Sequence, residues 1–215
     1  MPDQTVDWVA WHRSYDDPDS SQARRLARVQ EHLRRAIDDK PGPLRLVSMC
    51  AGEARDVVGV LSDHPRRNDV SARLVELDAR NVGVARSAID AAGLDQIEVV
   101  QADAGTTDSY LDAVPADIVL ACGIFGNISD EDVRWTVEHL PSLCASNAVV
   151  IWTRGRLQGR DVAHTIREWF ADAGFEELAF EVPAEAQYWY RVGVHRLWAG
   201  PRPLELGVRL FTFLR

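Results

Sequence analysis

The sequence predicts an α/β fold: a doubly wound, mostly parallel seven-stranded sheet with an antiparallel C-terminal edge hairpin and an N-terminal helical lid. Short apolar runs alternate with segments of helical spacing between residues 44 and 173, and this alternation is typical of βαβ units. The last two strand-like runs, 175–182 and 188–198, have no helical run between them, which favours an antiparallel pair. The run 117–122 (DIVLAC) is apolar after its first residue, as in a strand buried on both faces.

Length and composition fit one globular domain. The chain has 215 residues, 46% hydrophobic and 27% charged, which is enough for one full core. We expect a single domain made of a helical lid (1–40), a core (41–200) and a C-terminal tail or edge strand (201–215). The formal net charge of −9 argues against a nucleic-acid surface, because phosphate binding needs clustered Lys and Arg.

The N-terminal sequence lacks the apolar core of a secretion signal, and no run approaches the ~18 apolar residues of a membrane helix. Three cysteines without CxxC spacing indicate reduced thiols, and no His, Cys and carboxylate spacing suggests a metal site. We therefore expect a cytoplasmic protein without a metal, a membrane contact or a nucleic-acid partner. Homodimerisation stays open.

The first forty residues predict an aromatic segment followed by a helix. The aromatic segment lies among acids and contains Trp8, Trp11, His12 and Tyr15. The following DDPDSS is typical of a turn and a helix start. Apolar positions over 22–37 follow helical spacing, and Pro41 and Pro43 then end the helix.

Strands and helices alternate along the core. The expected strands are 44–49, 71–77, 96–101, 117–122 and 148–153, and the helices after them are 54–61, 78–92, 107–114, 130–140 and 161–173. Gly93 and Gly174 follow two of these helices, as C-capping glycines do. The stretch 204–214 is apolar enough for a strand or a tail packed on an edge.

In such a sheet a ligand binds beyond the carboxyl ends of the strands. The first strand leads into the small-residue turn Cys50-Ala51-Gly52, where the backbone can approach a ligand closely. Glu76 lies ~20 residues beyond the turn glycine, where an acid accepts hydrogen bonds from both ribose hydroxyls. Asp103 ends the third strand, where it could accept from an adenine amine. For each acid taken singly, a solvated loop residue is the alternative.

Over about residues 41–198 the chain resembles the class I S-adenosylmethionine-dependent methyltransferases. The segments similar to the family's four motifs are LRLVSMCAGEARD, LVELDARNVGVAR, QADA and ADIVLACGIFGNISDEDV. The two closing strands also resemble the family's edge hairpin. The resemblance implies S-adenosylmethionine as cofactor and methyl transfer to an oxygen, nitrogen or carbon of a small-molecule acceptor.

The resemblance also implies a role for the residues after each strand. The loop from Cys50 to Ala54 would face the methionine part of the cofactor, Glu76 the ribose, and Asp103 with Ala104 the adenine. The full expected cofactor-binding set is Ser48, Cys50, Ala51, Gly52, Glu53, Glu76, Leu77, Asp103, Ala104, Cys122 and Gly123.

The first motif departs from the family pattern. Ser48 holds the position of the usual acid, and Cys50 and Ala54 hold positions of glycines. Small residues still let the backbone approach a ligand, so cofactor binding is expected. Glu53 or Asp56 would replace the missing acid at the methionine amino group.

Methyl transfer from a sulfonium is an in-line displacement that mainly needs positioning and exclusion of water. Asn127 in the loop GIFGNI could orient an acceptor, or it could cap the next helix. His12 or Tyr15 could take a proton if the aromatic segment covers the cofactor. The alternative is that its tryptophans only anchor it to the sheet. The loop GIFGNI lacks the Asn-Pro-Pro-aromatic arrangement of many amino-directed family members, which disfavours nucleic-acid and protein-amide acceptors.

Several other interpretations stay open. Phe125 either borders the path along which the methyl group is transferred or packs in the core. Arg154 either binds an anionic acceptor or forms a surface salt bridge. Cys50 and Cys122 should end neighbouring strands and are interpreted as packing residues. One alternative function is a nicotinamide-dependent oxidoreductase, which the broken GxGxxG and the closing hairpin disfavour. Another is a non-catalytic protein that binds S-adenosylmethionine or S-adenosylhomocysteine.

Overall fold

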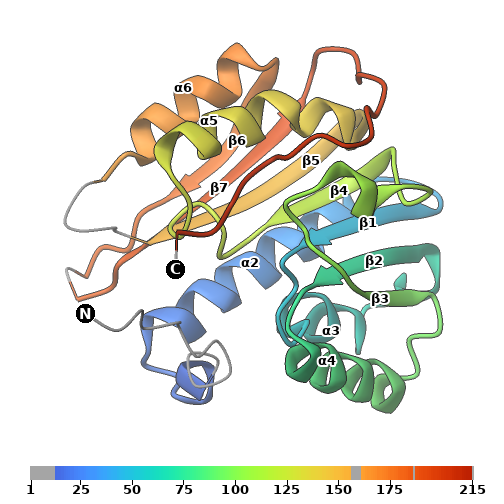
Figure 1. Ribbon diagram of the computed structural model, residues 1–215. Helices are drawn as coiled ribbons and strands as arrows, with labels where there is room; N and C mark the ends of the chain where they lie inside the picture. The colour runs from blue at the N-terminus through green and yellow to red at the C-terminus, as the bar shows by residue number, and fades with distance from the viewer. Residues whose placement is uncertain (1–12, 156–160, 186, 215) are drawn as a thin grey trace.

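The computed structural model describes residues 13–155, 161–185 and 187–214. Seven strands form one sheet in the order β3-β2-β1-β4-β5-β7-β6 (Figure 1). They are β1 (Leu44–Met49), β2 (Val70–Glu76), β3 (Ile97–Gln101), β4 (Ala116–Ala121), β5 (Cys144–Gly155), β6 (Phe175–Glu181) and β7 (Tyr190–Leu197). β1 to β5 pair in parallel, whereas β7 is antiparallel to both β5 and β6. The predicted doubly wound sheet with an antiparallel edge hairpin is confirmed.

Helices cover both faces of this sheet (Figure 1). One face packs against α2 (Ser21–Asp38), α3 (Arg55–Leu61) and α4 (Ala79–Ala92). The other packs against α5 (Asp130–His139) and α6 (Ala163–Asp172). Because both faces are covered, the central strands are apolar along nearly their whole length, as β4 shows. Short 3-10 turns occupy Arg13–Asp16, Arg67–Asp69, Thr107–Tyr110 and Leu140–Ser142.

Local signals in the sequence explain the ends of α2. Ser20 is its N-cap, and its side chain accepts a hydrogen bond from the Ala23 N–H at 3.0 Å. At the other end, the Arg66 guanidinium donates to the carbonyls of Ile37, Lys40 and Gly42, which a helix terminus and the following turn leave without helical partners. Both ends of the helix that leads into β1 are therefore fixed.

The strand order reverses at β1. The chain runs from β1 outward through β2 to β3, and then returns to place β4 on the other side of β1. In a doubly wound sheet, the carboxyl ends of the two strands at such a point diverge and leave a crevice for a ligand. Any site built on this fold is therefore expected where β1 and β4 end.

Two segments differ from the sequence predictions. The expected helix over 107–114 is only a 3-10 turn, Thr107–Tyr110, in which Tyr110 is fully buried and donates its hydroxyl to the Ala104 carbonyl at 2.6 Å. β5 begins at Cys144, earlier than predicted. The stretch 204–214, expected as a strand or a packed tail and here called the C-terminal strap, forms two isolated bridges, Thr106 with Arg209 and Ile128 with Phe213.

Candidate functional site

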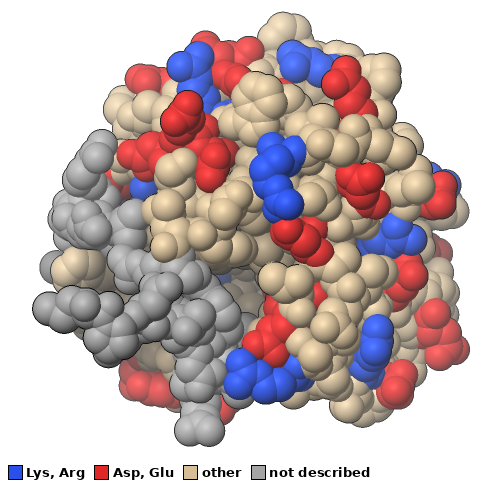
Figure 2. All heavy atoms as spheres, viewed as in Figure 1, with Lys and Arg blue, Asp and Glu red and all other residues tan. Residues whose placement is uncertain are grey.

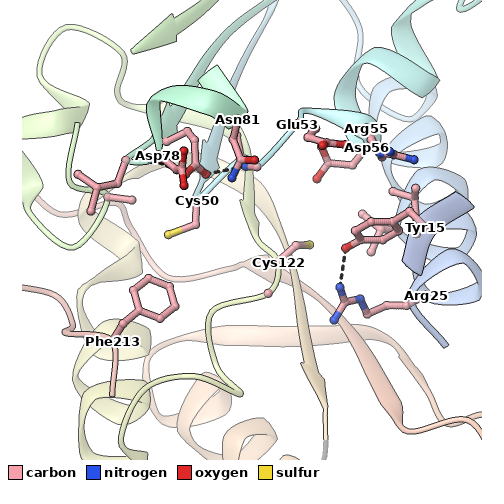
Figure 3. Close-up of a pocket in the computed structure, with 18 of the residues that line it drawn as sticks. Tyr15, Arg25, Cys50, Glu53, Arg55, Asp56, Asp78, Asn81, Cys122 and Phe213 are labelled. Carbon is pink, nitrogen blue, oxygen red and sulfur yellow. Dashed lines mark hydrogen bonds and ion pairs between the residues drawn. The ribbon is translucent and has the colours of Figure 1, made fainter. Parts of the chain in front are cut away.

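A cavity of about 330 Å³ lies at the carboxyl ends of the central strands (Figure 3). It is lined by Cys50 after β1, Leu77 after β2, Asp103 after β3 and Cys122 after β4. All of the predicted cofactor-binding residues except Ser48 line it, as does Tyr15. The sheet therefore brings together segments that are more than seventy residues apart in the sequence, at the place where the strand order reverses.

The turn after β1 has an unusual backbone. Cys50, Gly52 and Ala54 have φ angles of 55°, 57° and 59°, in the left-handed region. Only glycine enters this region without a steric cost, yet two of the three positions hold side chains. The N–H of Ala51 donates to the Val75 carbonyl at 2.9 Å, which ties the turn to the end of β2. The turn thus keeps the alternating left-handed backbone of a glycine-rich loop with a single glycine.

Glu76 links this turn to the loop after β2. Its Oε2 accepts from the Gly52 N–H and its Oε1 from the Asp78 N–H, both at 2.8 Å. The side chain is only 8% exposed. Each carboxylate oxygen has a second lone pair, so the group can still accept hydrogen bonds from a ligand. The neighbouring Asp78 caps α4, and its hydrogen bonds to the Arg80 side chain and backbone lower its pKa to about 2.

Asp103 is held in a similar way after β3. Its Oδ1 accepts from the Gly105 N–H at 2.8 Å, and its Oδ2 forms an ion pair with Arg209 of the C-terminal strap. Beside it, Ala104 is buried, and its carbonyl accepts the Tyr110 hydroxyl. The acidic groups at this end of the cavity are therefore oriented by backbone N–H groups before any ligand is bound.

The other end of the cavity is built from side chains of α2, α3 and the 3-10 turn that precedes α2. Arg25 donates to the Tyr15 hydroxyl at 2.7 Å (Figure 3). Asp56 lies in the first turn of α3 and is 9% exposed. Burial raises the pKa of the Asp56 carboxyl and that of the Tyr15 hydroxyl. Burial also raises the pKa of the Cys122 thiol, so this end contains groups that resist ionisation.

Three charged side chains, those of Arg55, Glu53 and Asp16, also border this end. Arg55 contacts the Glu53 carboxylate at 2.7 Å and the Asp16 carboxylate at 2.8 Å. Its guanidinium also lies 5.6 Å from the centre of the Tyr15 ring. Glu53 and Asp56, the two acids expected to replace the missing one in the first motif, both line the cavity.

Some predicted site residues lie elsewhere. Ser48 is inside β1, 1% exposed, between Leu74 and Leu120 of the neighbouring strands, and does not line the cavity. Asn127 also does not line it, because its Nδ2 donates to the Gly123 carbonyl at 2.7 Å. Ser129, not Asn127, caps α5. Trp8, Trp11 and His12 lie outside the described residues.

Two residues with open interpretations are settled by burial. Phe125 is fully buried with its ring centre 5.8 Å from that of Trp152, so it packs in the core. Arg154 is 3% exposed, forms an ion pair with Asp130 at 2.9 Å and donates to the Phe125 carbonyl at 2.6 Å. Its salt bridge is therefore buried rather than on the surface, and it holds the loop after β4 against β5.

Sequence reasoning did not assign Arg25, Leu26, Val29, Asn81 and Phe213 to the cavity wall. Asn81 lies within the second motif, and that motif is the signal that could have found it. The other four have no such signal, because three lie on the amphipathic helix predicted over 22–37 and Phe213 belongs to no motif. The Oδ1 of Asn81 is buried and, within the described part of the chain, has no hydrogen-bond partner.

Other features bear on the class of ligand. In the described ranges, no group of three or more His, Cys, Asp or Glu side chains could hold a metal ion. No helix of the described chain is both long and apolar enough to cross a membrane. On the face that Figure 2 shows, the described Lys and Arg side chains lie singly among Asp and Glu rather than in one broad patch.

Solved structures share this architecture at low sequence identity. ChlM, the magnesium protoporphyrin IX methyltransferase of Synechocystis PCC 6803 with bound SAM, has a TM-score of 0.69 and 15% identity, covering 89% of this chain and 91% of that chain. The same enzyme with bound SAH gives a TM-score of 0.63 and 15% identity, with 86% and 91% covered.

The names of two further matches indicate different methyl acceptors. Precorrin-6y C5,15-methyltransferase of Geobacter metallireducens GS-15 has a TM-score of 0.57 at 16% identity, with 80% and 86% covered. Sp1610 of Streptococcus pneumoniae, described as a tRNA (m1A22) methyltransferase, has a TM-score of 0.53 at 20% identity, with 81% and 72% covered. No protein-family model matches the chain, and no curated protein matches it. In architecture, the chain has the fold of the class I S-adenosylmethionine-dependent methyltransferases.

Proposed function

We propose that this chain binds S-adenosylmethionine in the cavity and transfers its methyl group to an oxygen, nitrogen or carbon of a small-molecule acceptor. One observation carries the proposal. The left-handed turn from Cys50 to Ala54 and the carboxylate of Glu76 are joined by a hydrogen bond at the point where the strand order reverses. This is where the fold binds ligands, and structures of the same fold hold SAM and SAH.

The adenosine half of the cofactor fits the end of the cavity that the backbone orders. Glu76 would accept from the ribose hydroxyls, and Asp103 from the adenine amine. Leu77 and Ala104 supply apolar wall beside them. A rotation of the Asn81 side chain would turn its unsatisfied Oδ1 toward the cavity, where a ribose hydroxyl could donate to it.

The methionine half fits the other end. Its ammonium group would pair with Asp56 or Glu53, the two carboxylates that border the turn. Its carboxylate would face Arg25, which reaches the cavity from α2. A cation and a carboxylate at the same end match a zwitterionic amino-acid group, whereas a nicotinamide cofactor carries no such group.

The bound cofactor supplies a sulfonium methyl group that an in-line nucleophile can displace. The chain's own residues position the acceptor and exclude water. Tyr15 is protonated at neutral pH, as an ordinary tyrosine is, and burial raises its pKa further, so its role would be that of a hydrogen-bond donor. Where Glu53 pairs with the ammonium group, Asp56, which lines the cavity and has a raised pKa, would be the carboxyl that receives a proton. Predicted roles for His12 and Asn127 remain predictions.

A small molecule is the proposed acceptor. The net charge of −9 and the interspersed surface charges are unfavourable for a polyanion such as tRNA. A second candidate function is binding of the cofactor without turnover. The raised pKa values of Tyr15 and Cys122 favour this candidate, because neither group is activated to take a proton.

Calorimetric titration with S-adenosylmethionine, S-adenosylhomocysteine and NADH tests the cofactor. We expect saturable binding of both adenosyl compounds and none of NADH, and the reverse pattern would contradict the proposal. A panel of hydroxyl, amine and activated-carbon acceptors with methyl-labelled S-adenosylmethionine then tests turnover. Labelled product supports the methyltransferase. Tight binding without labelled product on any acceptor supports the binder without turnover.

A further inference from the structure

The C-terminal strap (204–214) pairs with the loops that follow β3 and β4, through Thr106 and Ile128, and its Phe213 lines the cavity. The N–H of Leu210 donates to the Gly105 carbonyl at 2.7 Å, after β3. The N–H of Leu214 donates to the Asn127 carbonyl at 2.9 Å, after β4. The strap therefore joins the loops that follow two of the cavity's strands.

The strap is also anchored through side chains. Leu210 and Phe211 are almost fully buried in the core. The Trp135 indole N–H donates to the Arg209 carbonyl at 2.9 Å, and the Thr136 hydroxyl to the Leu210 carbonyl at 2.9 Å. These contacts from α5 hold the backbone at Arg209 and Leu210, and the bridge between Thr106 and Arg209 holds the same residue against the loop after β3.

At Gly105 the strap passes close to the loop after β3. A Cβ at this residue would lie 2.5 Å from the Phe211 carbonyl oxygen, which is closer than a Cβ atom approaches a non-bonded oxygen. The same Cβ would lie 3.0 Å from both Arg209 and Asp103. A glycine is therefore required here for the strap to reach the cavity.

At the cavity, the strap contributes two groups. Phe213 forms part of the wall and lies across the cavity from Tyr15 (Figure 3). Arg209 pairs with Oδ2 of Asp103, while Gly105 holds Oδ1. With one oxygen held by the backbone and the other by the strap, the Asp103 side chain has one orientation toward the cavity.

We propose that Arg209 is a positioning residue of the cofactor site: through its ion pair it fixes the Asp103 carboxylate in the orientation that accepts the adenine amine. The C-terminal strap is then a specificity element for the base. This inference rests on the proposed cofactor and assigns to the strap a role that its sequence does not suggest. A residue that only held the fold together would affect every ligand of the cavity alike.

The test compares two ligands that differ only at the base: S-adenosylhomocysteine and S-inosylhomocysteine, which has a carbonyl in place of the amine. Wild type should prefer the adenosyl compound. Arg209→Ala should lower the affinity for S-adenosylhomocysteine about 5- to 30-fold, which lies between the scale of a typical hydrogen bond and that of one to a charged group. The affinity for S-inosylhomocysteine should stay within about twofold. Arg209→Lys keeps a cation near Asp103 and should restore most of the affinity.

Arg202→Ala is the matched control, because Arg202 donates to the Glu138 carbonyl and does not line the cavity. It should change neither affinity, and thermal unfolding of each variant reports on its fold. Equal losses for both ligands in Arg209→Ala, no loss, or a gain would overturn the inference alone. Wild type that binds no S-adenosylhomocysteine would overturn the proposed function, and this inference with it.

Discussion

The two ends of the cavity hold their acidic groups in opposite ways. At the end proposed for adenosine, backbone N–H groups donate to Glu76 and Asp103, and the pKa of the neighbouring Asp78 is lowered to about 2. At the end proposed for the methionine group, Asp56 and Tyr15 are buried and their pKa values are raised. The first end is thus ordered by backbone N–H groups, whereas at the second burial disfavours the charged forms of Asp56 and Tyr15.

This difference separates recognition from chemistry. Carboxylates that accept from fixed N–H groups cost little to order when a ligand arrives, so they suit tight and selective binding. At the other end, the Asp56 carboxyl has a raised pKa and therefore exchanges its proton closer to neutral pH, which suits the end where a reaction would take place. Each of the following variants is expected to impair one end of the cavity and to leave the other end unchanged.

The largest effect is expected for Glu76→Gln. An amide has only one acceptor oxygen, so its NH₂ group would face the N–H of either Gly52 or Asp78. S-adenosylhomocysteine affinity should fall by about 1–3 kcal/mol, roughly 5- to 150-fold, measured by calorimetry. Glu98→Gln is the control, since Glu98 pairs with Arg73 on the surface of β3. Unchanged affinity in Glu76→Gln would remove this residue from the ribose site.

Asp56→Asn is expected to separate binding from stability. It removes the charge that would pair with the cofactor ammonium, so S-adenosylhomocysteine affinity should fall about 5- to 20-fold. It also removes a buried carboxylate, so the free energy of unfolding at neutral pH should rise. Asp63→Asn, at an exposed ion pair with Arg34, is the matched control for both measurements. A variant that binds normally would exclude Asp56 from the methionine end.

The pH dependence of Asp56→Asn has a defined sign. The folded-state pKa of Asp56 is raised above its unfolded value of about 3.9. The resulting stability is full below the unfolded pKa and is lost as pH rises through the folded pKa. Wild type should therefore lose stability relative to the variant as pH rises above about 4, measured by urea unfolding. Parallel pH profiles would contradict the raised pKa.

In the turn between the two ends, the expected effect is on stability rather than on affinity. Cys50→Val places a β-branched side chain at a φ of 55° and should destabilise the protein by about 1–2 kcal/mol. Cys50→Gly should be the more stable of the two variants, because glycine adopts this backbone freely. Cys122→Val is the control at a strand end without a left-handed φ. Equal unfolding free energies for all three would show that the turn is not strained.

The parts predicted from the sequence are those that local periodicity and strand order determine. β1 and β4 are apolar runs bounded by turns, and their ends place Cys50 and Cys122 at the cavity. The hairpin of β6 and β7 follows from two strand-like runs without a helical run between them. The positions of Glu76 and Asp103 at the cavity could also be predicted, because the carboxyl ends of parallel strands meet at one edge of the sheet. Most residues at the end proposed for adenosine could therefore be predicted from the sequence.

The remaining parts depend on contacts between distant segments. Arg25 lies on an amphipathic helix whose polar face looks like any solvated surface, and only the docking of α2 turns it toward the cavity. Phe213 and Arg209 belong to a strap whose path is set by α5 and Gly105, about a hundred residues away. Arg154 became a buried ion pair because Asp130 lies opposite it in the folded chain.

A crystal structure with S-adenosylhomocysteine tests the central claim most directly. The account predicts the ribose hydroxyls within hydrogen-bond distance of Glu76, the adenine amine at Asp103, and the amino-acid group between Asp56 and Arg25. A ligand bound in the reverse direction, with its adenine against Tyr15, or bound outside the cavity, would contradict the assignment of its two ends.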